Sequence, residues 1–156
     1  MSIDLPARPS TTTDEVWLYS THPDFLADGP LHDALDRPEI GKWLVFAPAR
    51  EIDDLWAKIS AATSAGLLGP MSKVSTASHK AERPGGAGGD YFVSCYVGPD
   101  KAAISEVLCG LRDLGISRQL FFKEDLATLL GQYGRGSTTY VSDPGSRTYH
   151  NVDGIA

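Results

Sequence analysis

The sequence is poor in cysteine, with Cys95 and Cys109 as its two examples in 156 residues. Neither belongs to a Cys-X-X-Cys pair, and the four histidines form no HExxH or comparable metal-binding pattern. The GxSxG turn of many serine hydrolases is also missing. These absences disfavour a zinc site, a metal-dependent enzyme and a serine hydrolase. We expect two reduced, buried thiols, no metal and no cofactor.

Long apolar runs and an excess of positive charge are absent as well. No stretch approaches the roughly 20 apolar residues of a membrane span, and residues 1–13 lack the basic and apolar segments of a signal peptide. The formal net charge of −6 disfavours non-specific binding of nucleic acid, because such binding depends on many cation–phosphate contacts. We therefore expect a cytoplasmic protein with no membrane or nucleic-acid partner.

The remaining composition, 42% hydrophobic, is that of a globular protein. Residues 1–13, with the tract STTT, predict a flexible leader. We expect a single α+β domain over residues 14–150 and a short tail at 151–156.

Hydrophobic periodicity predicts the elements of this domain. Apolar residues at i, i+3, i+4 and i+7 predict a helix over residues 50–65 that ends at Gly66, and a second apolar stripe predicts a helix over 104–114 that ends at Gly115. Compact apolar runs predict strands at 42–47, 72–76, 91–97 and 118–122. The order β-α-β-β-α-β predicts a two-layer α+β sandwich with a mainly antiparallel sheet, an extra edge strand near Trp17 and a late strand near Tyr140.

Two glycine-rich segments carry basic residues. The first, KVSTASHKAERPGGAGG (residues 73–89), is expected to end in a flexible hairpin loop, and the second, GQYGRGS, places Arg135 among three glycines. Small neighbours let a phosphate approach backbone amides as well as a guanidinium. Lys73 begins a short strand, where a partly dry surface would favour its neutral amine, the form that acts as a general base. The alternative is an edge-strand lysine whose ammonium extends into water.

The motifs GKWLVF, WAKI, GLLG, KVST, VSCYV and LRDLGI, in this order, resemble those of the basophilic-leukemia-expressed proteins, a family labelled as phosphothreonine lyase domain proteins. The resemblance covers roughly residues 41–135. It implies a fold like that of the cap-binding translation initiation factor, in which helices back a curved antiparallel sheet. More distantly, KVST, YVGPD and LLGQYGRGS are similar to segments of the phosphothreonine lyases that bacterial pathogens inject into host cells.

Those lyases remove phosphate by β-elimination without a metal: a lysine takes the Cα proton, a histidine protonates the departing oxygen, and other side chains hold the phosphate. The resemblance implies that Lys73 is the base. It implies phosphate contacts for four further residues, Lys42, Arg83, Tyr96 and Arg135.

The sequence departs from that pattern at the acid. The lyases carry their histidine two residues after the lysine that matches Lys42, and this position is Leu44, which cannot donate a proton. His79, six residues after Lys73 and on the same expected loop, is the candidate for a substitute acid that swings in, and the alternative is a mobile surface histidine without this role. The other possibility is departure without a dedicated acid, at a rate cost of about 10²- to 10⁴-fold.

The leading hypothesis is thus a phosphothreonine or phosphoserine lyase-like protein that acts on a phosphorylated protein or peptide. The first alternative is a non-catalytic phosphopeptide- or nucleotide-binding module, in which Trp17 would stack on a base because Trp43 and Trp56 fall in core patterns. The second is an interaction protein whose acidic N-terminal segment binds a basic partner.

Overall fold

The computed structural model describes residues 8–23, 41–82, 90–97, 102–124 and 140–151. Its helices are the 3₁₀ helix η1 (Pro9–Thr11), α3 (Ala49–Ser64), α4 (Ala77–Glu82) and α5 (Ala102–Asp113). Its strands are β1 (Trp17–Thr21), β2 (Gly41–Ala47), β3 (Met71–Ser75), β4 (Tyr91–Val97), β5 (Leu120–Glu124), β6 (Tyr140–Ser142) and β7 (His150–Asn151).

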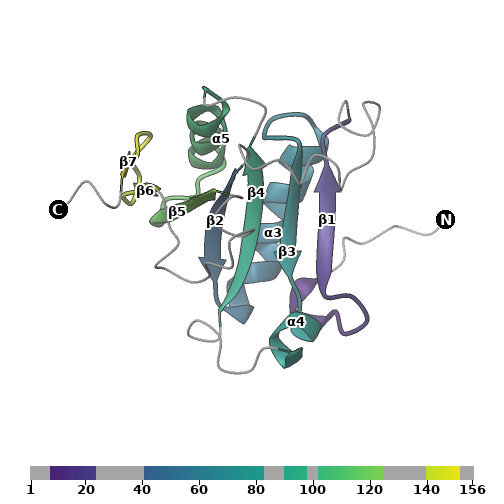
Figure 1. Cartoon of the computed structure of the whole chain (residues 1–156). Coiled ribbons are helices and arrows are strands. Elements are labelled where there is room, and N and C mark those ends of the chain that lie inside the picture. The colour runs from purple at the N-terminus through teal and green to yellow at the C-terminus, as the bar shows by residue number, and fades with distance from the viewer. Residues whose placement is uncertain (1–7, 24–40, 83–89, 98–101, 125–139, 152–156) are drawn as a thin grey trace.

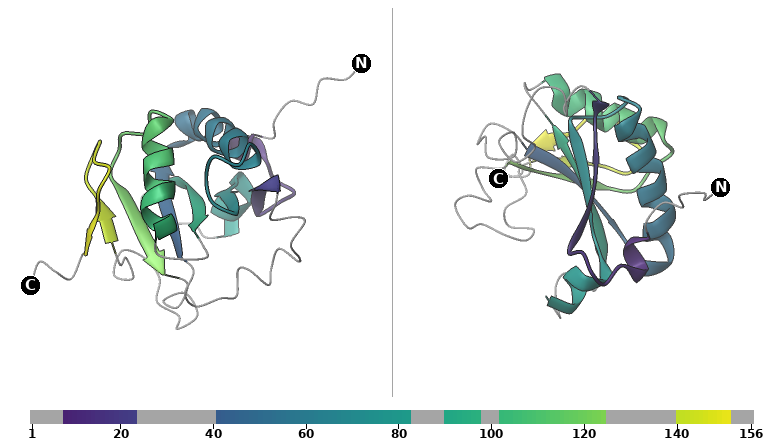
Figure 2. Two further views of the ribbon diagram at one scale, coloured as in Figure 1. Left: turned by 90° about the horizontal axis from the view of Figure 1, so that it is seen from above. Right: turned by 90° about the vertical axis from the view of Figure 1, so that its right-hand side faces the viewer.

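The strands of the described residues form one open antiparallel sheet in the order β1-β3-β4-β2-β5-β6-β7 (Figure 1). The central part of the chain has the predicted order of elements, β2-α3-β3-β4-α5-β5. In the sheet, β4 lies between β3 and β2. The two long helices, α3 and α5, pack on the same face of the sheet (Figure 2). This arrangement confirms the predicted α+β sandwich, including an edge strand that begins at Trp17.

Both long helices end as their glycines predict. Gly66 has φ +81° and Gly115 has φ +86°, a left-handed conformation that glycine adopts without steric cost. After α3, the Leu67 N–H donates to the Ala62 carbonyl at 2.9 Å, and after α5 the Ile116 N–H donates to the Leu111 carbonyl at 3.3 Å. These bonds satisfy carbonyls of the last helical turns and turn the chain back toward the sheet.

The core lies between the helices and the sheet. Along β2, buried and half-buried side chains alternate, so Trp43, Val45 and Ala47 face the helices. The Trp43 indole N–H donates to the Ile104 carbonyl on α5 at 3.0 Å, which satisfies its buried polar atom. Trp56 on α3 is also buried, so both tryptophans are core residues as expected.

Several elements differ from the sequence-based expectation. The segment expected to be a loop after β3 forms α4, because Thr76 caps it: the Thr76 side-chain oxygen accepts the His79 N–H at 3.3 Å. Strand β5 lies two residues later than predicted, and β7 was not anticipated. Within the expected leader, η1 is attached to α3, since the Ser10 N–H and hydroxyl both donate to the Asp53 carboxylate. The glycines of residues 85–89 and the segment 125–139 lie outside the described residues.

Candidate functional site

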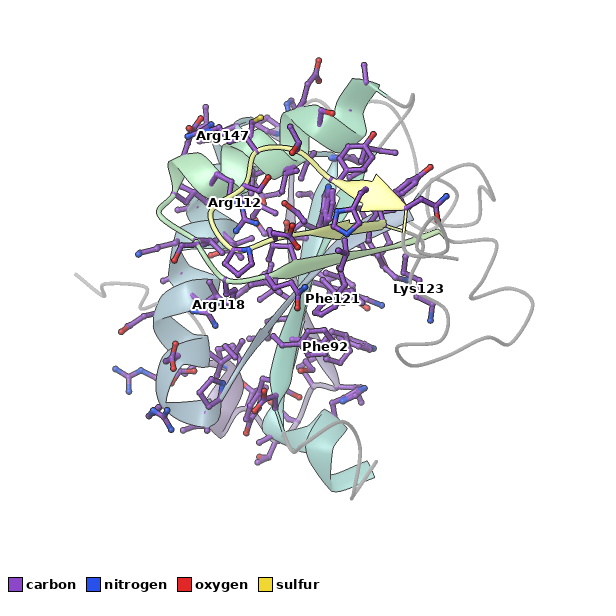
Figure 3. The ribbon with its side chains drawn as sticks, turned by 90° about the vertical axis from the view of Figure 1, so that its left-hand side faces the viewer. Phe92, Arg112, Arg118, Phe121, Lys123 and Arg147 are labelled. Atoms are coloured by element: carbon purple, nitrogen blue, oxygen red, sulfur yellow. The ribbon has the colours of Figure 1, made fainter. Side chains whose placement is uncertain are left out.

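The face of the sheet turned away from α3 and α5 carries the predicted lysines, and we call it the lysine face. Alternation along β2 puts Lys42, Leu44 and Phe46 on this face, opposite to the core residues. Residues in register across strands share a face, so Tyr96 joins Lys42, and both Lys73 and Ser94 join Leu44. Figure 3 shows Phe92, Phe121 and Lys123 on this side of the sheet, away from α3.

Three of the predicted site residues come together on the lysine face. Lys42 lies directly opposite Tyr96, and its Nζ is 5.2 Å from the centroid of the Tyr96 ring. The Nζ of Lys73 is 5.8 Å from the same centroid. Tyr96 is 4% exposed, so its ring forms a buried wall that both ammonium groups approach. Lys42, Lys73 and Tyr96 are far apart in sequence but adjacent in the sheet.

Lys73 makes a closer contact with Trp17 on the edge strand. Its Nζ lies 4.0 Å from the centroid of the Trp17 ring, a cation–π contact. The same ring contacts His79, with centroids 4.6 Å apart, and Phe92, with centroids 5.5 Å apart. Trp17 is therefore packed among three side chains, and its ring does not form an open surface on which a nucleotide base could stack.

His79 lies on α4, not on a mobile loop. Its backbone N–H is part of the helix cap at Thr76, and its ring packs against Trp17 and Phe92. The expectation that His79 lies on a mobile loop is wrong, because α4 and these ring contacts set its position. His79 and Lys73 touch the same tryptophan ring, which brings the predicted acid and base into one cluster.

Two predicted site residues are not placed. Arg83 and Arg135 both lie outside the described residues. At the position of the missing histidine, Leu44 lies between Ser94 on β4 and Phe121 on β5. Its apolar side chain has no proton to donate, so this position supplies no acid in place of the histidine of the lyases.

Sequence reasoning missed two polar residues on this face. Lys123 lies directly opposite Lys42 on β5 and is 8% exposed. It escaped notice because the strand was expected to end at residue 122. Ser94 lies opposite Lys73 and is 1% exposed, and the alternation from Tyr96 along β4 would have identified it.

The hydroxyl of Ser94 has an unusual environment. Among buried side-chain polar atoms of the described residues, its oxygen is the one that makes no hydrogen bond. Ser75, also 1% exposed and on the same face, instead accepts the Phe92 N–H at 3.0 Å. Buried hydroxyls are normally paired, so Ser94 requires an explanation.

Aromatic side chains continue across the lysine face from Trp17. Successive ring centroids lie 4.6 to 6.0 Å apart. We call this set the aromatic row; its members are His79, Trp17, Phe92, Phe46 and Phe121. All of them are half-buried, so each ring retains surface for contact with another molecule.

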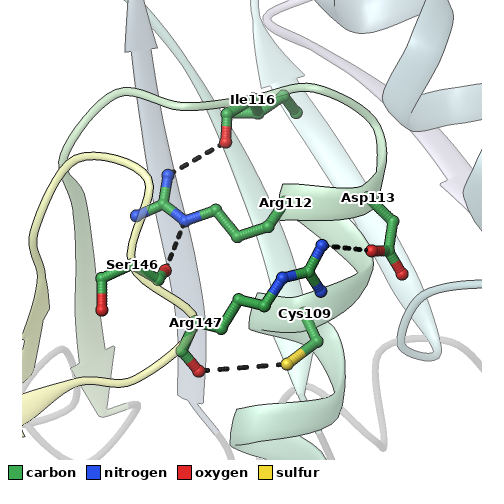
Figure 4. A network of polar contacts seen from close by, with 6 residues as sticks. All are labelled: Cys109, Arg112, Asp113, Ile116, Ser146 and Arg147. Atoms are coloured by element: carbon green, nitrogen blue, oxygen red, sulfur yellow. Dashed lines mark hydrogen bonds and ion pairs between the residues drawn. The ribbon is translucent and has the colours of Figure 1, made fainter.

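A second polar cluster, around Arg112, is structural. Arg112 is 8% exposed, and its guanidinium donates to the carbonyls of Ser146 and Ile116 (Figure 4). It also donates to the carbonyls of Arg118 and Asp143 and to the Ser142 hydroxyl. Burial lowers the Arg112 pKa, and the nearby positive charge of Arg147 acts in the same direction. Because its donors are engaged by the chain itself, Arg112 fastens α5 to the segments around β6 and is not a ligand site.

The remaining features of the described residues add little chemistry. A shallow hollow of about 400 Å³ between β1 and α3 is lined by Leu18, Trp56, Ser60 and their neighbours, with no charged side chain. Both cysteines are free: Cys95 is buried as expected, whereas Cys109 is half-buried. Within these residues, no three metal-ligating side chains gather at one point, and no helix has the length and apolar character to cross a membrane.

Fold and site together define the class: an α+β protein whose antiparallel sheet is covered by helices on one face and carries lysines and aromatic rings on the other. The sequence model of the family "Basophilic leukemia-expressed protein Bles03" matches residues 37–131, more than half of the chain, and the chain belongs to this family. The matched region includes Lys42, Lys73 and Tyr96. No curated protein matches the chain.

Proposed function

We propose that this protein removes phosphate from phosphothreonine or phosphoserine in a protein or peptide by β-elimination on the lysine face. The neutral amine of Lys73 takes the Cα proton, the electron pair of that bond forms the Cα=Cβ double bond, and the Cβ–O bond breaks. The products are a dehydroamino acid and inorganic phosphate. The reaction as proposed needs no metal or cofactor and takes place in the cytoplasm.

The observation that carries the proposal is the approach of Lys42 and Lys73 to one buried ring, that of Tyr96. Two lysines beside one ring provide a base and a cation to hold the phosphate dianion. Lys123, opposite Lys42, adds a third amine to the same part of the sheet.

The phosphate contacts follow from this placement. Lys42 and the Tyr96 hydroxyl hold the phosphate, and Arg83 and Arg135 are the guanidinium donors that the resemblance to the lyases implies. His79 is the proposed acid for the departing oxygen, since its ring touches the tryptophan on which Lys73 rests.

The aromatic row supports a peptide substrate in preference to a small phosphate ester. An extended peptide that places its phosphorylated residue at the lysines has neighbouring side chains within reach of Phe92 and Phe46. Aromatic surface of this kind favours apolar neighbours, because burying them against the rings removes apolar area from water.

Mass spectrometry of a phosphothreonine peptide tests the reaction directly. We expect the product to have lost phosphoric acid, and we expect Lys73→Ala to abolish this loss. Lys58→Ala is the matched control, since Lys58 is exposed on α3 and on the other side of the sheet. Hydrolysis to unmodified threonine, or no change across a panel of phosphopeptides, contradicts the proposal.

The alternative is a phosphopeptide-binding module without chemistry, and Leu44 is the observation that favours it. Leu44, between Ser94 and Phe121, puts an apolar side chain where the lyases carry their acidic histidine. Calorimetry distinguishes the two functions: binding of phosphopeptide without any product supports the module. The nucleotide version predicts a nucleotide signal that Trp17→Ala removes, and the packing around Trp17 argues against it.

A further inference from the structure

Ser94 is a buried polar group that the fold does not use. Its side chain is 1% exposed and, within the described part of the chain, its oxygen is without a hydrogen-bond partner. An unpaired buried hydroxyl destabilises a protein, because it gives up its bonds to water and gains none in return. Alanine would occupy the same space without that cost.

The position of Ser94 relates it to the lysines. It lies directly opposite Lys73 on β3 and Leu44 on β2, and Tyr96 and Phe92 flank it on its own strand. These four side chains are all larger than serine. Lys42, opposite Tyr96, is its diagonal neighbour. Ser94 therefore places a hydroxyl between Lys73 on β3 and Lys42 on β2.

We propose that the Ser94 hydroxyl is a phosphate ligand, donating a hydrogen bond to a phosphoryl oxygen that Lys42 also contacts. This inference rests on the proposed function and adds a residue to its site. A phosphoryl oxygen supplies the acceptor that the hydroxyl lacks, and charge-assisted bonds of this kind are stronger than neutral ones. The ligand class is a phosphate monoester, because its several peripheral oxygens can accept from a hydroxyl and an ammonium group together.

Access to Ser94 involves Lys73. Lys73 is the neighbour opposite the hydroxyl with a long, flexible chain, and its Nζ lies 4.0 Å from the centroid of the Trp17 ring. In the proposed reaction its amine turns from Trp17 toward the Cα proton of the peptide, which makes room for a phosphoryl oxygen beside Ser94.

The competing explanation is that serine occurs here for its small size alone. The two explanations make opposite predictions for Ser94→Ala. If size is what matters, alanine binds phosphate as well as serine does. If the hydroxyl is a ligand, alanine leaves the free protein as stable as before or more so, but it weakens phosphate binding.

The experiment uses the full chain and a peptide in which a methylene group replaces the bridging oxygen of phosphothreonine, so that binding is measured without elimination. We expect Ser94→Ala to weaken binding by about tenfold or more in calorimetry, with an unchanged or higher melting temperature. Ser75→Ala is the matched control, because it breaks the bond from the Phe92 N–H: its melting temperature should fall by roughly 2–4 °C, with affinity within about twofold of wild type.

Three outcomes overturn the inference: equal affinity of Ser94→Ala and wild type, a fall in melting temperature of Ser94→Ala that matches Ser75→Ala, or no binding of the phosphonate peptide to wild type. Failure of the proposed reaction is distinguishable from these. If no phosphoric acid is lost but Ser94→Ala still weakens binding, the site stands and the chemistry does not. If elimination occurs and Ser94→Ala leaves its KM unchanged, the reaction stands and Ser94 is not a ligand.

Discussion

The ammonium nitrogen of Lys73 lies 4.0 Å from the centroid of the Trp17 ring, which connects the proposed base to an optical reporter. We expect the phosphonate peptide to change tryptophan fluorescence when Lys73 turns from Trp17 toward the bound peptide. Trp43 and Trp56 are 0% and 4% exposed in the core and should contribute a constant background. The change should vanish in Trp17→Phe, and its persistence there would show that another part of the protein responds.

Substituting His79 tests whether a dedicated acid exists. His79→Phe keeps an aromatic ring against Trp17 and Phe92 but removes the proton donor. We expect kcat for elimination to fall by about 10²- to 10⁴-fold with KM little changed. His150→Phe, exposed on β7, is the control. An unchanged kcat in His79→Phe would mean that the phosphate departs without this acid.

The aromatic row predicts a preference among peptides. Phe46 packs against Phe92 and Phe121, and it lies four residues after Lys42 on β2. We expect Phe46→Ala to raise KM several-fold for peptides with an apolar residue near the phosphothreonine, because it removes apolar contact area. Peptides with alanine at those positions should be affected less, and inhibition by inorganic phosphate should not change. Equal effects on all peptides would argue for general loss of structure, which the melting temperature of the variant would reveal.

Removing the Arg112 side chain should lower the melting temperature of the protein without weakening peptide binding. Arg112→Ala deletes five hydrogen bonds and leaves four carbonyls and a hydroxyl to find new partners. We expect a loss of about 3 kcal/mol or more, equivalent to roughly 6–12 °C in melting temperature. Arg147→Ala is the control: Arg147 is exposed, and its bond to Asp113 is a surface ion pair, so the melting temperature should hardly move. Similar losses in both variants would contradict the structural role given to Arg112.

The Cys95 thiol should be unreactive in the folded protein, and it should make the free energy of unfolding fall as the pH becomes alkaline. Burial raises its pKa from 9.0 to about 12, against a smaller opposing effect of a hydrogen bond with Ser72. At about pH 8 we expect a disulfide reagent to modify Cys109 and spare Cys95 until the protein unfolds. Above pH 9.0 the unfolded thiol loses its proton while the folded one keeps it, so stability falls as pH rises toward 12.

Denaturant titrations at several values between about pH 8 and pH 11 measure this fall in the free energy of unfolding. Burial also raises the pKa of Tyr19 and of Tyr91, so both tyrosines add to the alkaline loss with the same sign. Cys95→Ala should therefore reduce the slope without abolishing it. A slope that is identical in Cys95→Ala and wild type would exclude a contribution from the thiol.

Much of the architecture was predictable because it depends on local patterns. The apolar stripe at Ile52, Leu55, Trp56 and Ile59 defines α3, and Gly66 supplies the left-handed residue that ends it. The order of these elements then restricts the topology, since short connections and a shared core leave few arrangements. Helix α4 was not predicted, although Thr76 is a good capping residue, because the glycines that follow in the sequence indicated a loop for the whole segment.

The site was only partly predictable. The sequence itself determined the α+β class, the core tryptophans and, through a family resemblance, the identities of Lys42, Lys73 and Tyr96. Which of them meet was decided by strand register, because Lys42, Lys73 and Tyr96 become neighbours only when β4 inserts between β3 and β2. The contact of Lys73 with Trp17, the pairing of Lys123 with Lys42 and the unpaired hydroxyl of Ser94 are likewise properties of the assembled sheet. Local sequence patterns specify helices and strands, but contacts between distant segments depend on how those strands pair.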